Sequence, residues 1–149
     1  MTRNYTTRRS AIANSLVDLL KEIDGTGDYL SDVGGNVLPK LQFWDEIEEF
    51  PAIRVTSGLE RRVYQGGGYK DRFLSVTVRC YVKDEEPIAA LERLLEDVET
   101  VIEQNGRLAY LDSRGVPQFT HDITIVSIDT DEGALDPLGV GEILLQVHY

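Results

Sequence analysis

Hydrophobic and polar residues alternate strictly in the middle of the chain. Over residues 73–82, apolar side chains at every second position share one face and polar side chains share the other, which is the period-two pattern of a half-buried strand. After a charged turn, Pro87 stands where helices favour their first residue. Apolar residues then recur at helical spacing over residues 88–102, and Asn105-Gly106 ends the pattern. This stretch predicts one strand and one amphipathic helix, and it contains no pattern typical of a catalytic site.

A shorter helix is expected near the amino terminus. Thr6 or Thr7 can cap it, because a hydroxyl there accepts a hydrogen bond from a free N–H group of the first turn. Apolar residues recur at helical spacing over residues 12–23, and the glycines that follow end the pattern. Residues 24–51 are expected to form a long loop with one short extended piece over residues 37–43.

Three aromatic residues fall within this loop, namely Phe43, Trp44 and Phe50. Large aromatic side chains bury much apolar area, so the cluster is expected to close one end of the core. An exposed Trp44 at a contact between subunits is the alternative.

The remaining extended segments complete a sheet. Residues 52–57 predict a short strand, and residues 58–72 predict a β-hairpin arm whose tip carries three successive glycines. Residues 108–118 are interpreted as a loop. Residues 123–128 carry apolar side chains at both odd and even positions, so both faces of the strand are partly apolar. This pattern favours either a central strand covered on both faces or a strand with a bulge. A last strand is expected over residues 140–149.

Together these elements predict an α+β fold, with an antiparallel sheet of about four strands, two helices packed on one face and a protruding β-hairpin arm. At 149 residues the chain is long enough to bury a core without disulfides, so residues 1–149 are expected to form a single domain. The one cysteine, Cys80, falls on the apolar face of the middle strand, where we expect a buried and unreactive thiol.

Charge is the unusual feature of the composition. The chain has 26 Asp and Glu residues against 15 Lys and Arg residues, for a formal net charge of −11. Binding to nucleic acid or to an anionic membrane depends on basic residues, so both partners are disfavoured. The chain also lacks a secretion signal and a run apolar enough to span a membrane, so synthesis in the cytoplasm is expected. Acidity can line a channel for DNA or mimic DNA, and a solvated surface is the simplest explanation.

Few residues suggest chemistry. Four carboxylates share a turn-rich loop, but their spacing does not match a calcium-binding loop, so we expect a solvated or interfacial loop and no metal site. The members of this acidic loop are Asp129, Asp131, Glu132 and Asp136. The two histidines, His121 and His148, are too few for a histidine metal site. No nucleophile motif or cofactor loop is found, so the sequence predicts neither an enzyme nor a cofactor.

The order of these elements resembles a known family. The likeness is carried by the capped first helix, the segment Phe50-Pro-Ala-Ile-Arg-Val55, the basic glycine-tipped arm, the strand and helix of residues 73–105, and the acidic loop with its closing strand over residues 125–149. In this order they resemble the tail terminator proteins of long-tailed phages, the minor tail protein U-like group, over nearly the whole chain.

The resemblance implies a structural virion protein at the head-proximal end of the tail. Such a protein forms a hexameric ring that caps the tail tube, ends tube polymerisation, docks to a neck or head-completion protein and lets DNA pass without specific binding. Its partners would be copies of itself, the tail tube protein and the neck protein. The acidic loop would face the ring lumen or an interface. The arm residues expected to contact the neighbouring subunit or the tube are Arg61, Arg62, Tyr64, Tyr69, Lys70 and Arg72.

Two alternatives stay open. A neck or head-to-tail completion protein would have the same size and the same tendency to form rings. An acidic DNA-mimic inhibitor would explain the negative charge, but the concentration of basic residues on one arm argues against it.

Overall fold

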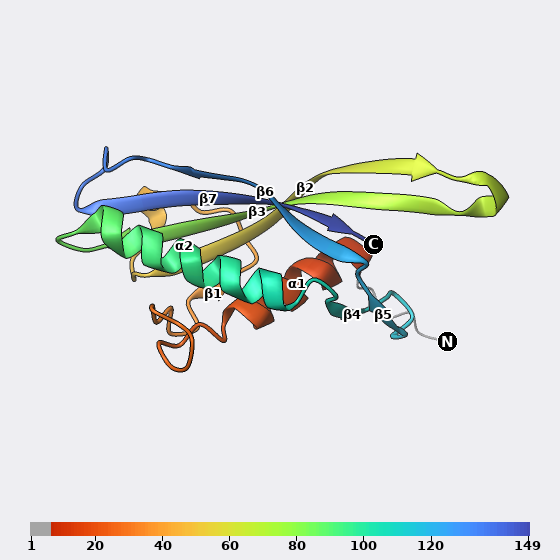
Figure 1. The fold of residues 1–149 in the computed structure, drawn as a ribbon, viewed down its shortest axis with the longest axis horizontal. Coiled ribbons are helices and arrows are strands. Elements are labelled where there is room, and N and C mark those ends of the chain that lie inside the picture. Colours follow the sequence, from red (N-terminus) through yellow and green to blue (C-terminus); the bar gives the residue numbers. More distant parts are fainter. Residues whose placement is uncertain (1–6) are drawn as a thin grey trace.

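The computed structural model describes residues 7–149 as an elongated molecule built on one main sheet (Figure 1). Two α-helices lie on the same side of this sheet, and a two-stranded arm extends from one of its ends. Thr6, one of the two predicted helix caps, lies outside the described residues. The elements in chain order are α1 (Arg8–Leu20), β1 (Val37–Leu38), the 3-10 helix η1 (Trp44–Glu46), β2 (Ala52–Tyr64), the 3-10 helix η2 (Gly66–Gly68), β3 (Lys70–Lys83), α2 (Pro87–Gln104), β4 (Ala109–Leu111), β5 (Pro117–Phe119), β6 (Asp122–Thr130) and β7 (Leu138–His148).

The main sheet has five strands in the order β1-β2-β3-β7-β6. The long strands β2, β3, β7 and β6 are antiparallel neighbours, whereas the two-residue β1 pairs with β2 in parallel. Strands β4 and β5 form a separate small hairpin. The expected α+β fold is therefore confirmed, with one short parallel strand added at the sheet edge.

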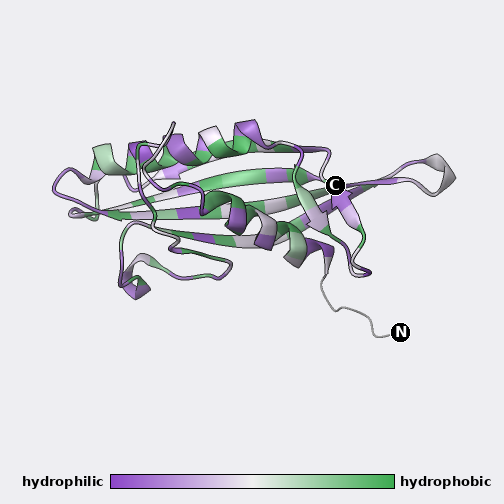
Figure 2. Ribbon diagram, turned by 90° about the horizontal axis from the view of Figure 1, so that it is seen from below, coloured by the Kyte–Doolittle hydropathy of each residue, from purple (hydrophilic) through white to green (hydrophobic). Residues whose placement is uncertain are grey.

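The core lies between the two helices and one face of the sheet. Every second residue of β3 from Leu74 to Val82 is buried there, and Val78 and Cys80 have no exposed surface. Leu16 of α1 and Leu94 of α2 belong to the same buried cluster. Figure 2 shows hydrophobic residues along the strands that the helices cover. Burial raises the pKa of the Cys80 thiol to about 12, so this group is un-ionised at neutral pH, as expected.

Two glycines of β7 let α2 lie close to the sheet. A Cβ atom on Gly139 would stand 2.7 Å from a methyl carbon of Val82 and 3.0 Å from the carbonyl oxygen of Pro87. A Cβ atom on Gly141 would stand 3.1 Å from a methyl carbon of Leu95. Because glycine has no side chain, the helix and the strand can approach at these two positions.

Both helices begin where the sequence predicts. The Thr7 side chain accepts a hydrogen bond from the Ser10 N–H group at 3.1 Å and caps α1. Helix α2 begins at Pro87 and ends before Asn105. Among the described residues, no helix is long and apolar enough to cross a membrane.

A buried carboxylate on α2 fastens the long loop that follows α1. Asp97 lies within the apolar stripe of the helix and is only 1% exposed. Its two oxygens accept hydrogen bonds from the N–H groups of Leu30 at 2.8 Å and Ser31 at 2.7 Å. The first half of the loop is therefore ordered by its contact with the helix.

The interpretation of residues 108–118 as a loop is wrong, because they contain the hairpin of β4 and β5. The turn between these strands is organised by Asp112, whose carboxylate accepts hydrogen bonds from the N–H groups of Arg114 and Val116. The bond from Val116 is the main reason that the pKa of Asp112 lies below its usual range. Strands of three residues leave no periodicity for a sequence pattern to detect.

The mixed apolar pattern of residues 123–128 comes from a bulge in β6. The register of β6 against β7 shifts between Ile125 and Ser127, so the bulged alternative is confirmed. The other alternative, a central strand covered on both faces, is wrong because β6 lies at the edge of the sheet.

The aromatic residues of the long loop close the core only in part. Phe50 packs near Tyr81 on the sheet face opposite the helices. Phe43 and Trp44, in contrast, are 54% and 42% exposed, so the prediction that they cover the core is wrong. The alternative of an exposed Trp44 describes the structure, and its place in a subunit contact stays a prediction.

Candidate assembly surfaces

The arm is a continuation of β2 and β3 beyond the body of the sheet (Figure 1). The two strands remain paired as far as Tyr64 and Lys70, and the predicted glycine tip, Gly66–Gly68, joins them. Strand β7 ends with His148 opposite Phe73, so the outer part of the arm has no third strand beside it in the part of the chain that the structure describes. The arm therefore presents free strand edges to its surroundings.

The carboxyl-terminal residues brace the root of the arm. His148 Nε2 lies 3.0 Å from an oxygen of Asp71. The Tyr149 hydroxyl donates a hydrogen bond to Glu60, and the same glutamate pairs with Arg62 at 2.7 Å. These contacts tie both strands of the arm to the end of β7.

The same contacts change the acidity of the groups involved. The hydrogen bond with His148 holds the pKa of the Asp71 carboxyl below its usual range. Burial, together with the bond to Glu60, raises the pKa of Tyr149 to about 12. Burial alone would raise the pKa of Glu60, but hydrogen bonds from Tyr149 and Arg62 outweigh it and lower that pKa. At neutral pH the root therefore combines ionised carboxylates with a neutral phenol.

Basic side chains of the arm lie over aromatic rings. The distances from the charged group to the ring centroid are 4.8 Å for Arg61 over Phe73, 6.0 Å for Lys70 over Tyr64 and 5.5 Å for Arg72 over Tyr149. Such cation–π contacts hold the long side chains in place without neutralising them. The structure thus brings the predicted arm residues together on one hairpin, although Arg62 is paired with a carboxylate of the arm itself.

Large apolar side chains on the arm are uncovered. Leu59, Tyr64 and Tyr69 are 75%, 69% and 76% exposed. Exposed tyrosines beside arginines are typical of surfaces that contact another protein. The arm is therefore the most conspicuous candidate contact surface of the chain.

The acidic loop lies at the opposite end of the molecule from the arm (Figure 1). The carboxylate of Asp131 is used inside the loop, where it accepts hydrogen bonds from two backbone N–H groups at 3.2 Å each. Asp129 lies on β6 opposite Glu142 of β7, and Glu132 and Asp136 are exposed. Within residues 7–149, no group of three His, Cys, Asp or Glu side chains is placed to hold a metal ion.

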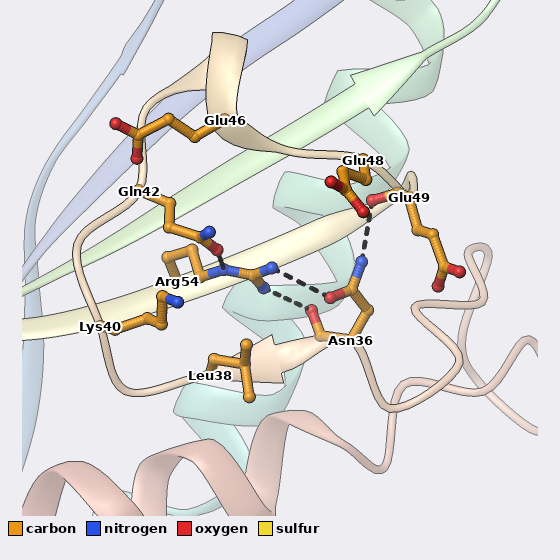
Figure 3. A pocket seen from close by; sticks show the side chains of 8 residues that line it. All are labelled: Asn36, Leu38, Lys40, Gln42, Glu46, Glu48, Glu49 and Arg54. Carbon is orange, nitrogen blue, oxygen red and sulfur yellow. Dashed lines mark hydrogen bonds between the residues drawn. The ribbon is translucent and has the colours of Figure 1, made fainter.

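A buried arginine lines a cavity of about 360 Å³ beside β1 (Figure 3). Arg54 is 5% exposed, and its guanidinium donates to the Gln42 side chain at 2.6 Å and to the backbone and side chain of Asn36 at 3.1 Å each. A fourth bond goes to the Ile53 carbonyl oxygen, so the acceptors of all four bonds are uncharged. Burial lowers the pKa of Arg54. This residue fastens the loop to β2. Its place between Ile53 and Val55 fits the alternation of a half-buried strand, so no signal in the sequence shows that it is buried.

Comparisons with known proteins agree with one another. A protein family described as Bacteriophage Tail Tube Terminator Protein matches residues 6–149. A tail tube terminator protein of Escherichia phage T5 is 36% identical to this chain, and the match covers 95% of this chain and 92% of that protein. A chain from the virion of a native gene transfer agent particle has a similar structure, with a TM-score of 0.54 and 10% identity over 93% of this chain and 96% of that chain. At this low identity the structural match concerns the fold alone.

Proposed function

The chain belongs to the bacteriophage tail tube terminator protein family, and we propose that it ends the growth of a phage tail tube by forming a hexameric ring at the head-proximal end of that tube. The ring docks to a neck or head-completion protein, and DNA passes through its central hole. The protein is made in the host cytoplasm and then becomes part of the virion tail.

The observation that carries this proposal is the extent of the family match. It covers residues 6–149, and so it includes the arm, the helix-covered body and the acidic loop. All three features therefore lie within the part of the chain that the family match covers. Each of these three features is therefore a candidate surface for ending the growth of the tube.

The ring itself is supported by the arrangement of charge. The basic arm and the acidic loop lie at opposite ends of the molecule, so one copy cannot pair its own arm with its own loop. Contacts between unlike surfaces on successive copies either close into a ring or continue as a filament. Electrostatic complementarity favours such contacts and fixes their orientation.

Passage of DNA is supported by the net charge of −11 per chain. In each of the six copies 26 carboxylates outnumber 15 basic residues, so the ring repels the phosphate backbone overall. The acidic loop is proposed to face the lumen or an interface between copies.

The two alternatives lose support. A neck or head-to-tail completion protein is less consistent with a family match that names the tube terminator. An acidic DNA mimic does not need the exposed, basic and aromatic arm. No catalytic role is proposed.

The proposal is tested with a double substitution on the arm, Arg61→Glu with Arg62→Glu. The purified variant and the wild type are each mixed with assembling tail tube protein. Native mass spectrometry then measures how many copies assemble into a ring, and electron microscopy measures the lengths of the tubes. We expect the wild type to give rings and tubes of uniform length. The variant should give few rings and tubes that continue to grow, because reversed charges weaken the contact between copies.

A matched control reverses two exposed basic residues away from the arm, Arg93→Glu with Arg114→Glu. It has the same net charge as the arm variant and should cap tubes normally. Wild-type protein that stays monomeric even when tubes are present would contradict the terminator role. Tubes of normal length with the arm variant would show that the arm residues are not part of the contact.

A further inference from the structure

Within residues 7–149, no strand pairs with the outer edge of β6. Strand β6 is the last strand of the main sheet, and β7 pairs with only one of its sides. The bulge after Ile125 divides it, and the half that follows, residues 126–130, is almost fully uncovered. Val126 is 56% exposed and Ile128 is 43% exposed. An open edge with apolar side chains can pair with a strand from another chain.

The surroundings of this edge are acidic. The sequence from Gly115 to Tyr149 contains six carboxylates and no Lys or Arg. Asp129 lies on the edge strand itself, and Asp131 and Glu132 follow directly after it. Glu142, opposite Asp129, is already paired with Arg79 at 3.2 Å. A strand that docks here should therefore bring positive charge.

The arm has the features that this edge requires. Its outer part has free strand edges, because β7 ends opposite Phe73. It carries Arg61, Lys70 and Arg72 in addition to its exposed apolar residues. Four residue pairs extend from Arg61 and Phe73 to Tyr64 and Lys70, and this length is about 14 Å at roughly 3.4 Å per residue. The uncovered half of β6 has five residues, about 17 Å by the same measure, so this part of the arm can lie along it.

The arm that docks must come from another copy. The arm continues β2 and β3 away from the body, so it cannot turn back to the far end of β6 in its own chain (Figure 1). The opposite edge of the sheet is a poorer acceptor. There, β1 pairs with part of β2, and the loop that carries Lys40 and Gln42 lies beside it. Arg9 from α1 donates a hydrogen bond to the Gly58 carbonyl oxygen on this side. These contacts use backbone groups of the β2 edge that an added strand would need.

We propose that the uncovered half of β6, residues 126–130, receives the arm of a neighbouring copy as an added strand. Val126 and Ile128 contact the arm's apolar side chains, while Asp129 and Glu132 face its arginines. This inference rests on the proposed ring, and it identifies the surface that the arm contacts. It assigns the acidic loop to an interface between copies.

A charge exchange between the two surfaces tests the contact. The arm variant is Arg61→Glu with Arg62→Glu, and the acceptor variant is Asp129→Arg with Glu132→Arg. Each variant alone places like charges opposite each other at every contact, and we expect ring formation with tubes to fall at least about tenfold. In an equal mixture, arm variants and acceptor variants can alternate around an even-numbered ring. Every contact then has opposite charges, and the mixture should form rings again.

The outcomes separate this inference from the ring proposal. An acceptor variant that forms rings as well as the wild type overturns the assignment of β6 and leaves the ring proposal standing. Loss of rings with both variants, without recovery in the mixture, shows that the two surfaces do not meet and also overturns the assignment. Wild-type protein that forms no ring overturns both proposals.

A control variant guards against a general effect of charge. Glu92→Arg with Glu96→Arg makes the same charge change on the solvent face of α2. It should form rings on its own, and it should not rescue the arm variant. Rescue by this control would overturn the assignment. Circular dichroism checks that each variant keeps the wild-type fold.

Discussion

Strands β2 and β3 form one hairpin with two very different halves. In the body, residues 52–57 and 74–82 lie next to the helices, and the side chains on that face are buried. Beyond the register shift that follows Ser57, the same strands form the arm, where side chains from Arg61 to Lys70 are all exposed. The backbone pairing continues across both halves, but only the first half buries apolar surface.

The difference separates stability from assembly. Burial of apolar area is the main source of folding free energy, whereas an isolated hairpin is at best marginally stable in water. The arm is therefore ordered through its root, where His148 and Tyr149 hold it, and it contributes little to the body. We expect substitutions in the body to lower stability, and substitutions on the arm to alter contacts with other chains.

The largest effect on stability is expected for Leu94→Ala in the body. Leu94 lies on α2 with no exposed surface, so the change removes buried contacts and leaves a cavity. The free energy of unfolding should fall by about 2–5 kcal/mol, measured by urea denaturation. Glu92→Ala, on the exposed face of the same helix, should change it by less than about 0.5 kcal/mol. If Leu94→Ala and Glu92→Ala lowered the free energy of unfolding equally, the distinction between buried body and exposed surface would be wrong.

A smaller effect is expected for Asp97→Ala. This change leaves the N–H groups of Leu30 and Ser31 without their acceptor, and it should lower the free energy of unfolding by about 1–3 kcal/mol. Hydrogen exchange should show faster exchange at these two amides, with little change in the arm. The adjacent exposed residue gives the control, Glu96→Ala, which should leave both amides protected.

The smallest effect concerns acid and the root of the arm. The pKa of Asp71 is lower in the folded protein than in the unfolded chain, because its carboxylate is hydrogen-bonded to His148. Its stabilising contribution is therefore complete above the unfolded pKa of about 4 and is lost as the pH falls through the lower folded pKa. Thermal unfolding from about pH 6 to about pH 2.5 should show this loss in the wild type and less of it in Asp71→Asn.

A second variant checks that the acid effect belongs to this contact. His148→Phe removes the imidazole that is hydrogen-bonded to Asp71, while the Gln65 side chain still donates to the other carboxylate oxygen at 3.1 Å, so the acid-dependent loss should shrink by its larger part. The double variant should show no further reduction beyond that of Asp71→Asn, since both changes remove the same interaction. Independent effects of the two changes would mean that the root is braced by other groups.

Regular periodicity explains which parts of the fold could be predicted. The alternation in β3 and the apolar stripe of α2 span enough residues to define a strand and a helix, and Thr7 and Pro87 mark the helix starts. The arm was also predictable, because its glycine tip and its basic residues stand out in an acidic chain.

The parts that could not be predicted depend on single buried polar groups. Asp97 orders the long loop, Arg54 fastens its second half, and Asp112 closes the β4–β5 hairpin. A periodic pattern treats a charged residue as solvent-facing, so it misses a charge that is buried because backbone groups satisfy it. A signal was present in Asp97, which interrupts the apolar stripe of α2, whereas Arg54 stands where the alternation of β2 places polar residues.

The same logic applies to the candidate surfaces. The sequence located the arm and the acidic loop, but strand order decides which edges are free, and no local pattern contains that order. The long-range pairing of β7 with β3 places β6 at the outside of the sheet. The exposed Val126 can be recognised as part of a candidate contact surface only when the edge position of β6 is known.

The burial of Cys80 makes the chain convenient for optical experiments. Its thiol has no exposed surface and a pKa of about 12, so a maleimide dye would leave it unlabelled. At the tip of the arm, a Cβ atom on Gly66 would meet nothing within 4 Å. Gly66→Cys would therefore give one reactive site without removal of the native cysteine. A fluorophore attached there could follow the arm of a single molecule as it meets a growing tube.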